Sequence, residues 1–291
     1  MKIILSIVTY KNEEHLNRNL ESLYASDITK FNFKVEIINN HSYFVLHDEF
    51  KHKVKVLHNS LRPDWSTGHI TKDYNSALVR NFVKLSKPEV DWVVTVQDDV
   101  IWKPNWATEL FGRAERHNLN FITSGIGDSI VASTAEAIRR IGLWDERFNA
   151  IATHEGDMFA RAVLWNPNHS SINDMGHGRV WNPCDDGRMG QEHVNYRYDS
   201  LFITQPSRNA DQYAAIDARE VKGGGFASGL CQESIYQNKW GHYHNAWSII
   251  TSTRPARPAG NSYFSYPYFE LDMYDWREKG YVFGGLNGSV V

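Results

Sequence analysis

The carboxylates Asp98 and Asp99 stand side by side at the end of an apolar run, residues 91–100. The run is rich in valine, which is typical of a strand that is buried on both faces. Trp102 and Pro104 follow, so we expect the chain to leave the sheet at once. Ligands of an open α/β sheet bind just outside the carboxyl ends of its strands. Two acids at that place suit a hard divalent cation that carries phosphate oxygens, although aspartates also cap or solvate strand ends.

Strands and helices alternate on both sides of this run. Apolar or alternating stretches predict further strands at residues 3–9, 33–38, 54–57 and 121–124. Apolar residues at helical spacing predict helices after residue 12, over 70–82, over 106–117 and from 134 to 141. Asn12 is expected to cap the first helix, and the glutamates Glu13 and Glu14 favour its positive end. The alternation predicts an α/β fold with a mostly parallel sheet and helices on both faces.

The composition changes at about residue 166. Glycine, asparagine, histidine, proline and aromatic residues dominate from there on, and the helical and strand periodicities fade. We therefore expect a core domain over residues 1–165 and a loop-rich C-terminal extension over 166–291 that packs on it, with one helix near 229–240. The chain has 10 tryptophans and 14 tyrosines. Such side chains stack on sugar rings and bases, so the extension suits a carbohydrate or nucleotide site.

Charge and cysteine content exclude several classes of protein. The net charge is -3, with acids and bases nearly balanced, so no basic surface for nucleic acid is expected. Two cysteines, Cys184 and Cys231, are too few for a disulfide framework or a cysteine-built zinc site. The N-terminal apolar run is too short for a signal peptide, and no stretch approaches the roughly 20 apolar residues of a membrane span. We expect a soluble, cytoplasmic protein, with peripheral association at a membrane surface as an alternative.

Five motifs in the first 165 residues occur in an order that is similar to one known family. They are IVTYKNE at 7–13, EIINNHS at 36–42, the asparagine- and glycine-containing segment 59–75, VQDDV at 96–100, and GLWDERF at 142–148 followed by HEGDMFAR at 154–161. Together they resemble the family 2-like GT-A glycosyltransferases. The resemblance implies a GT-A (Rossmann-like) fold and transfer of a sugar from a nucleotide-diphospho-sugar to a hydroxyl of a saccharide or glycan acceptor.

The resemblance also implies a divalent metal, Mn²⁺ or Mg²⁺. Breaking the sugar–phosphate bond builds negative charge on the diphosphate, which a metal beside Asp98 and Asp99 would neutralise. Gln97 stands where the family has the first acid of its metal-binding DXD motif. Strand side chains alternate between faces, so Gln97 and Asp99 share one face and Asp98 takes the other. We expect Asp99 to be the metal ligand, and Asp98 to be hydrogen-bonded, linked through water or turned toward the sugar.

The catalytic motif of the family corresponds here to Glu155 and Asp157. An inverting transferase needs a base that takes the proton from the acceptor hydroxyl, and Glu155 matches the family's base position. Asp157 lies four residues before Arg161, at the spacing of a helical ion pair that would hold the start of the helix in place. Alternatively, both acids only favour a helix N-terminus.

A nucleotide-sugar site follows from the same resemblance. It comprises Thr9, Tyr10, Glu13, Asn39, Arg62, Asn75, Gln97, Asp98 and Lys239. The first three would line the base pocket, and Asn39 replaces an acid that contacts the base or ribose, which an amide can do as both donor and acceptor. Arg62 and Asn75 either contact the diphosphate or pack locally, and a surface salt bridge is a further alternative for Arg62.

The tail supplies the remaining candidates. Residues 236–244 resemble a Lys-Trp-Gly segment that follows the catalytic domain in some family members, so Lys239 could meet phosphate. His242 or His244 could complete the metal shell, since neutral imidazole is a common ligand.

Three other functions stay open. A nucleotidyltransferase would use the same carboxylates to hold magnesium, but it needs a glycine-rich basic loop after the first strand, where residues 11–14 are acidic. A non-catalytic carbohydrate-binding protein would use the aromatic tail alone and would not need a base at Glu155. A retaining transferase is a further alternative, because the sequence does not fix the stereochemistry.

Overall fold

The computed structural model describes residues 1–10, 12–40, 44–59, 68–83, 90–123, 128–148, 153–165, 198–199 and 203–205. The chain divides into two compact units. The first unit comprises residues 1–65, 88–134 and 180–213, and the second comprises 66–87, 135–179 and 214–291. The predicted helix near residues 229–240 lies outside the described residues.

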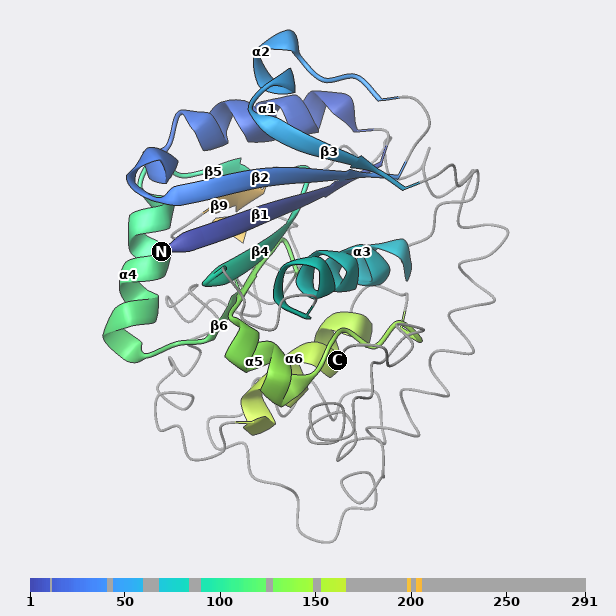
Figure 1. Cartoon of the computed structure of the whole chain (residues 1–291), viewed down its shortest axis with the longest axis vertical. Coiled ribbons are helices and arrows are strands. Elements are labelled where there is room, and N and C mark those ends of the chain that lie inside the picture. The colour runs from blue at the N-terminus through green and yellow to red at the C-terminus, as the bar shows by residue number, and fades with distance from the viewer. Residues whose placement is uncertain are drawn as a thin grey trace, which may run out of the picture. The chain divides into compact units, whose positions relative to one another are not determined.

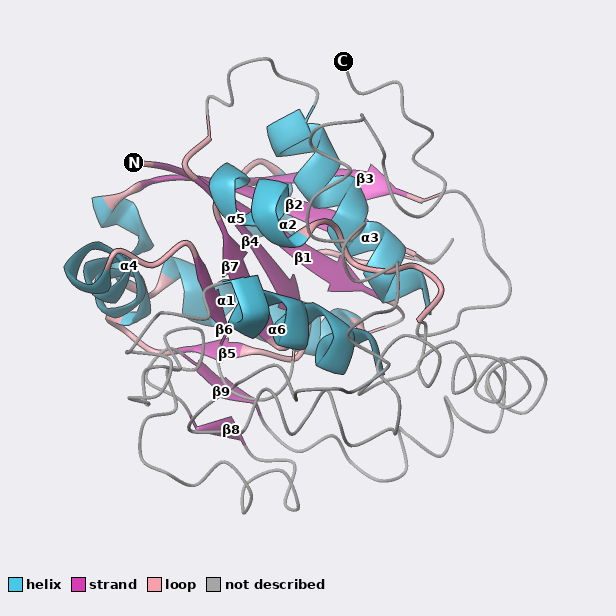
Figure 2. Ribbon diagram, turned by 90° about the horizontal axis from the view of Figure 1, so that it is seen from below, coloured by secondary structure: helices cyan, strands magenta, loops and turns pink. Residues whose placement is uncertain are grey.

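The first unit contains a six-stranded sheet in the order β3-β2-β1-β4-β7-β6 (Figure 2). Its strands β3, β2, β1 and β4 lie side by side in Figure 1 as well. The strands are β1 Lys2–Thr9, β2 Asn32–Asn39, β3 Val54–His58, β4 Trp92–Gln97, β6 Phe121–Thr123 and β7 Ile130–Ser133. β3, β2, β1 and β4 are parallel, and β7 runs antiparallel to its neighbours β4 and β6. The predicted α/β class with a mostly parallel sheet is confirmed.

Helices and a small second sheet complete the described part of the first unit. The helices are α1 Glu13–Tyr24, the 3₁₀ turn η1 Asp27–Lys30, α2 Asp48–Lys51 and α4 Trp106–His117. The second sheet has the order β5-β9-β8, with β5 Ile101–Trp102, β8 Tyr198–Asp199 and β9 Ile203–Gln205. The predicted helix over 106–117 is confirmed with the same bounds.

The hydrophobic core of the first unit lies between the main sheet and helices α1 and α4. Leu16, Leu20 and Leu23 recur along α1 at helical spacing and are fully buried. They belong to one apolar cluster with Leu110 and Phe111 of α4 and with alternate residues of the central strands. In β1 the residues of the opposite face are buried as well, which explains why this strand is an unbroken apolar run.

The described elements of the second unit are all helical. They are α3 Gly68–Leu78, the π-helical turn η2 Val79–Val83, α5 Ala135–Ile141 and α6 Thr153–Trp165. None of the helices in the described part of the chain is long and apolar enough to cross a membrane.

The order of the strands creates a topological switch in the first unit. The chain passes from β1 to β2 and β3 on one side, and then returns to place β4 on the other side of β1. The carboxyl ends of β1 and β4 therefore lie next to each other where the connections diverge, and Val8 of β1 is paired with Gln97 of β4. In open α/β sheets this is where ligands bind.

Candidate functional site

The ends of the parallel strands bring together polar residues from four distant parts of the sequence. We call the ends of β1 to β4, with the residues that follow each of them, the carboxyl edge. Thr9 of β1 is paired with Asn39 of β2, and Asn39 is paired with His58 of β3. Gln97, which ends β4, is followed by a turn that contains Asp98 and Asp99.

Asp98 accepts hydrogen bonds on both of its carboxylate oxygens. The Thr9 hydroxyl donates to Oδ2 at 2.8 Å, and Nδ2 of Asn12 donates to Oδ1 at 2.8 Å. Asp98 is only 4% exposed. Asn12 occupies the N-cap position of α1, but its side chain makes no capping hydrogen bond, so the predicted cap is wrong. The Asn12 amide instead ties the start of α1 to the end of β4.

Asp99 is also buried, at 2% exposure, in the same turn. Gln97 beside it is fixed through its main chain, because its N–H donates to the carbonyl of Ser129 and its carbonyl accepts from Nδ2 of Asn19, both at 3.1 Å. The side chain of Gln97 donates through Nε2 to Oδ1 of Asp128. A third buried acid, Asp128, which is 3% exposed, therefore lies next to the carboxyl edge, and we count it with that edge from here on.

Sequence reasoning missed Asp128 because it missed β7. Residues 130–133 form a short apolar run that follows Asp128 and Ser129. Because β7 runs antiparallel to β4, it begins at the edge where β4 ends, so an acid just before β7 lies beside acids just after β4. The signal in the sequence was an acid that precedes a short apolar run, whereas Asp98 follows its apolar run.

The ends of β2 and β3 are rich in amides. Nδ2 of Asn39 lies 3.0 Å from Nδ1 of His58, and Asn39 is 1% exposed. With the Asn39 amide as donor, Nδ1 of His58 is the acceptor, which assigns the tautomer protonated on Nε2. Next to this pair, Nδ2 of Asn59 donates to Oδ1 of Asn40 at 2.9 Å. These groups can both donate to and accept from a polar ligand.

The remaining predicted nucleotide residues of the first unit lie at the end of β1 and the start of α1. Tyr10 directly follows β1 and is buried, and Glu13 is the first residue of α1. Their roles, like those of Thr9, Asn39, Gln97 and Asp98, stay predictions. The other candidates, Arg62, Lys239, His242 and His244, lie outside the described residues.

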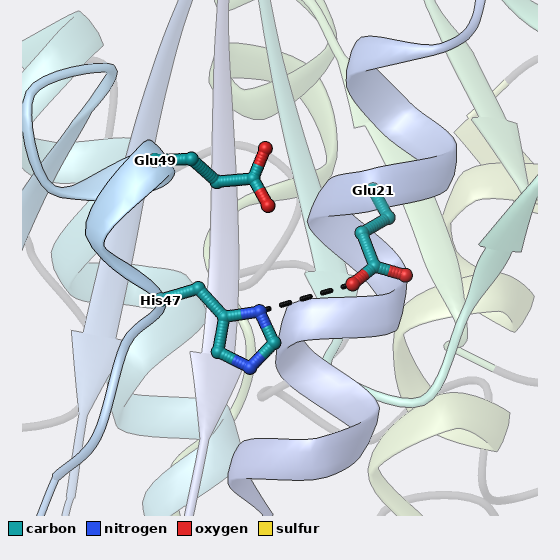
Figure 3. A group of neighbouring side chains, drawn as sticks. All are labelled: Glu21, His47 and Glu49. Carbon is teal, nitrogen blue, oxygen red and sulfur yellow. Dashed lines mark ion pairs between the residues drawn. The ribbon is translucent and has the colours of Figure 1, made fainter.

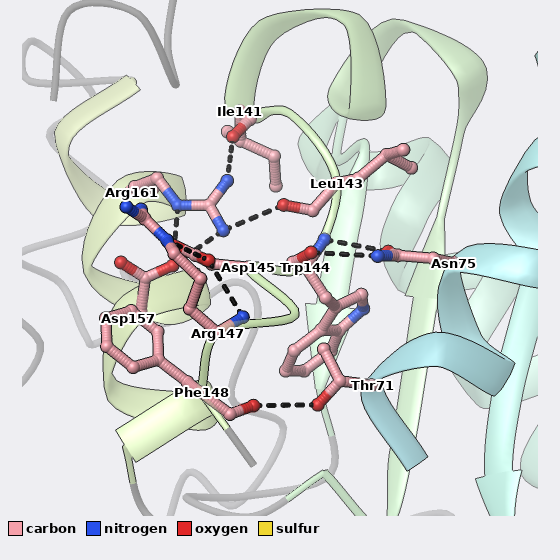
Figure 4. A network of polar contacts seen from close by, with 10 residues as sticks. All are labelled: Thr71, Asn75, Ile141, Leu143, Trp144, Asp145, Arg147, Phe148, Asp157 and Arg161. Carbon is pink, nitrogen blue, oxygen red and sulfur yellow. Dashed lines mark hydrogen bonds and ion pairs between the residues drawn. The ribbon is translucent and has the colours of Figure 1, made fainter. Parts of the chain in front are cut away.

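In the second unit the predicted ion pair of α6 is confirmed (Figure 4). Nη2 and Nε of Arg161 donate to Oδ2 of Asp157 at 2.7 and 3.0 Å, and both side chains are buried. The guanidinium also donates to the carbonyls of Ile141 and Leu143. Arg161 therefore fixes the first turns of α6 to the segment that follows α5. Glu155, in the first turn of α6, is 5% exposed.

Asn75 holds the continuation of that segment (Figure 4). Its Nδ2 donates to the Trp144 carbonyl at 2.8 Å and to Oε1 of Glu146 at 3.0 Å, and its Oδ1 accepts from the Trp144 N–H at 2.9 Å. Asn75 is fully buried, so the structure shows local packing, one of its two predicted roles. Contact between Asn75 and a diphosphate stays a prediction. Such a contact would replace one of these three hydrogen bonds.

Burial raises the pKa of Glu146, and the hydrogen bond from Asn75 offsets part of this effect. Burial removes water from the Glu146 carboxyl, and this loss of water opposes its ionisation. Thr71 of α3 holds the end of the same segment, because its hydroxyl donates to the Phe148 carbonyl at 3.1 Å (Figure 4).

A separate group of possible metal ligands lies on the exposed surface of α1 and α2. Glu21, His47 and Glu49 have ligand atoms within 4.8 Å of one another (Figure 3). Nδ1 of His47 lies 3.8 Å from Oε1 of Glu21, and both side chains are about half exposed. A solvent-exposed ion pair of this kind needs no metal to explain it.

No protein-family model matches the chain, and no curated protein matches its sequence. Among solved structures, S. aureus TarS is 12% identical with a TM-score of 0.44, over 60% of this chain and 40% of TarS. The chain thus spans less than half of that protein. TarS 1–349 in complex with UDP is 12% identical, with a TM-score of 0.42 over 99% of this chain and 95% of that one.

A third structure is the mannosyltransferase PcManGT from Pyrobaculum calidifontis in complex with GDP-Man and Mn²⁺. It is 10% identical with a TM-score of 0.41, over 96% of this chain and 87% of that one. All three TM-scores are below 0.5.

Proposed function

We propose that this protein is a glycosyltransferase that moves a sugar from a nucleotide-diphospho-sugar to an acceptor hydroxyl, with inversion at the sugar and a divalent metal at Asp99. The observation that supports this most is the set of buried acids at the carboxyl edge, beside the switch between β1 and β4. Ligands bind at such switches, and the motif order of the chain resembles that of family 2-like GT-A transferases.

The chemistry of the donor set fits a hard metal ion. Carboxylate oxygens are the ligands that Mg²⁺ and Mn²⁺ prefer. Asp99 would hold the ion, while Asp98 is engaged by Thr9 and Asn12 and keeps the turn after β4 in place. A bound divalent ion would neutralise the charge that builds on the departing diphosphate. Thr9, Tyr10 and Asn39 would contact the nucleoside.

Glu155 would act as the base in a single displacement. It takes the proton from the acceptor hydroxyl, whose oxygen bonds to the anomeric carbon as the sugar–phosphate bond breaks and the nucleoside diphosphate leaves. The Asp157–Arg161 ion pair fixes the turns of α6 that carry Glu155. In this account Asp157 is a positioning residue.

Release of nucleoside diphosphate tests the proposal. The protein is incubated with UDP-, GDP- and dTDP-sugars and a panel of simple saccharide acceptors, with manganese or with a chelator. We expect one donor class to be consumed only with the metal, and Asp99→Ala to abolish this activity. Asp91→Asn is the matched control, because Asp91 lies at the opposite end of β4, is 60% exposed and should not affect turnover.

Glu155→Gln tests the base. The rate should fall by about 10²–10⁴ while binding of the diphosphate is kept, because only the proton acceptor is lost. Formation of pyrophosphate from a nucleoside triphosphate and a sugar phosphate would instead identify a nucleotidyltransferase. Saccharide binding without any turnover, unaffected by Glu155→Gln, would identify a binding protein.

A further inference from the structure

Gln97, which precedes the two acids of the turn after β4, carries an amide, and the partner of this amide is an acid. Gln97 stands where the DXD pattern has its first carboxylate, and its side chain donates to Oδ1 of Asp128. Asp128 lies in the segment just before β7, which is the antiparallel neighbour of β4. Both side chains belong to the first unit.

We propose that Asp128 supplies, at the metal–diphosphate site, the carboxylate that position 97 lacks. This inference rests on the proposed function, because it adds a residue to the same site. It assigns Gln97 a second task, which is to aim the Asp128 carboxylate.

The strand pairing fixes the main chain on the two sides of the Gln97–Asp128 contact. Val96 is paired with Ile130 in the sheet, and the Gln97 N–H donates to the Ser129 carbonyl at 3.1 Å. The strand pairing thus continues to the residue next to Asp128. On its other side the Gln97 carbonyl is held by Asn19 of α1 at 3.1 Å. Because both its main-chain N–H and its main-chain carbonyl are hydrogen-bonded, Gln97 presents its side-chain amide to Asp128 from a defined position.

The charges favour this division of roles. A carboxylate that accepts a hydrogen bond from a neutral amide keeps its full negative charge, and charge is what a divalent cation needs. Two carboxylates at positions 97 and 128 would repel each other at hydrogen-bond distance. An acid at one of these positions and an amide at the other give a single negative charge and a hydrogen bond between them. The same holds when the acid stands at position 97 and the amide at position 128.

The exchange is the basis of the experiment. Binding of manganese with UDP, GDP and dTDP is measured by calorimetry for the wild type, Asp128→Asn and the double variant Gln97→Glu/Asp128→Asn. Asp128→Asn keeps the size and an acceptor oxygen for Gln97, so we expect a folded protein whose manganese-dependent affinity is about 10–100-fold weaker. The double variant restores one carboxylate and one amide, and its affinity should return close to that of the wild type.

The controls separate this inference from the function on which it rests. If Asp99→Ala abolishes metal-dependent binding while Asp128→Asn leaves it unchanged, the role of Asp128 is wrong and the proposed function stands. If the wild type shows no metal-dependent binding of any diphosphate, the proposed function itself fails. Thermal unfolding in a chelator shows whether each variant is folded. If Asp128→Asn does not fold, the double variant decides, because loss of its manganese affinity overturns the inference.

Discussion

Asp98 is bound by side chains that lie 86 and 89 residues earlier in the chain, Asn12 and Thr9. The two bonds join the end of β1, the start of α1 and the end of β4 at a single buried carboxylate. A buried acid that is hydrogen-bonded on both oxygens organises the loops around it. At the residue scale, Asp98 is the fixed point of the proposed site, and Asp99 and Asp128 are two further buried acids of the same unit.

The bond between Asn12 and Asp98 predicts a particular pattern of stability. Asn12→Ala should cost about 1–3 kcal/mol, because it removes a hydrogen bond to a buried carboxylate. Asn12→Ser should cost nearly as much, although serine is an excellent helix cap, because its side chain is too short to replace the amide. Urea unfolding of the three proteins measures this. Wild-type stability of the serine variant would show that residue 12 acts as a cap.

At the scale of elements, helices are fixed by groups from outside their own sequence. Helix α4 begins after Asn105, whose side chain makes no capping bond. Asp27 of η1 takes that role, since its Oδ1 accepts from the Ala107 N–H at 3.1 Å and its Oδ2 accepts from the Thr108 N–H at 3.0 Å. In the second unit, Arg161 and Asn75 hold the segment 142–148 in a comparable way.

Removing this distant cap should destabilise the protein. Asp27→Ala should lower the free energy of unfolding by about 1–2 kcal/mol, which is the usual cost of losing a helix cap. Asn105→Ala is the matched control, and its effect should stay within about 0.5 kcal/mol because that exposed side chain caps nothing. Chemical denaturation of both variants provides the comparison, and a larger loss for Asn105→Ala would contradict the assignment.

Glu146 predicts a pH dependence of stability. Because burial raises its pKa in the folded protein, the folded state holds this proton more strongly than the unfolded state. Stability is therefore lost as pH rises from the ordinary carboxyl value of 4.5 through the raised value. Glu146→Gln removes this loss and keeps an oxygen for Asn75. Its melting temperature should exceed that of the wild type at neutral pH, by a margin that shrinks toward pH 4.

Glu109→Gln in α4 is the control for this pH series, since it removes a glutamate from the other unit. The difference in melting temperature between Glu109→Gln and the wild type should not show the pH dependence expected for Glu146→Gln. A Glu146→Gln difference that is flat with pH, or that grows as the solution is acidified, would contradict the pH dependence predicted for Glu146.

At the scale of the whole molecule, local patterns of the sequence predicted the parallel part of the sheet and helix α4. Apolar runs and helical spacing need no knowledge of distant residues, so β1 to β4 and α4 were accessible. Asn12 was assigned as a cap because its partner Asp98 lies far away in the sequence. Asp128 was missed because its place depends on β7 entering the sheet in the antiparallel direction. Asn75 has two predicted roles, and only its hydrogen bonds to Trp144 reveal the local one, while diphosphate contact stays a prediction.

The position of the metal tests the central claim most directly. Crystals grown with manganese and the nucleoside diphosphate that binds would be measured at the manganese absorption edge. The account predicts an anomalous peak at the carboxyl edge, bonded to Asp99 and next to the diphosphate, and the same peak in a His47→Ala variant. A peak at Glu21, His47 and Glu49 that disappears in His47→Ala, with none at Asp99, would contradict it.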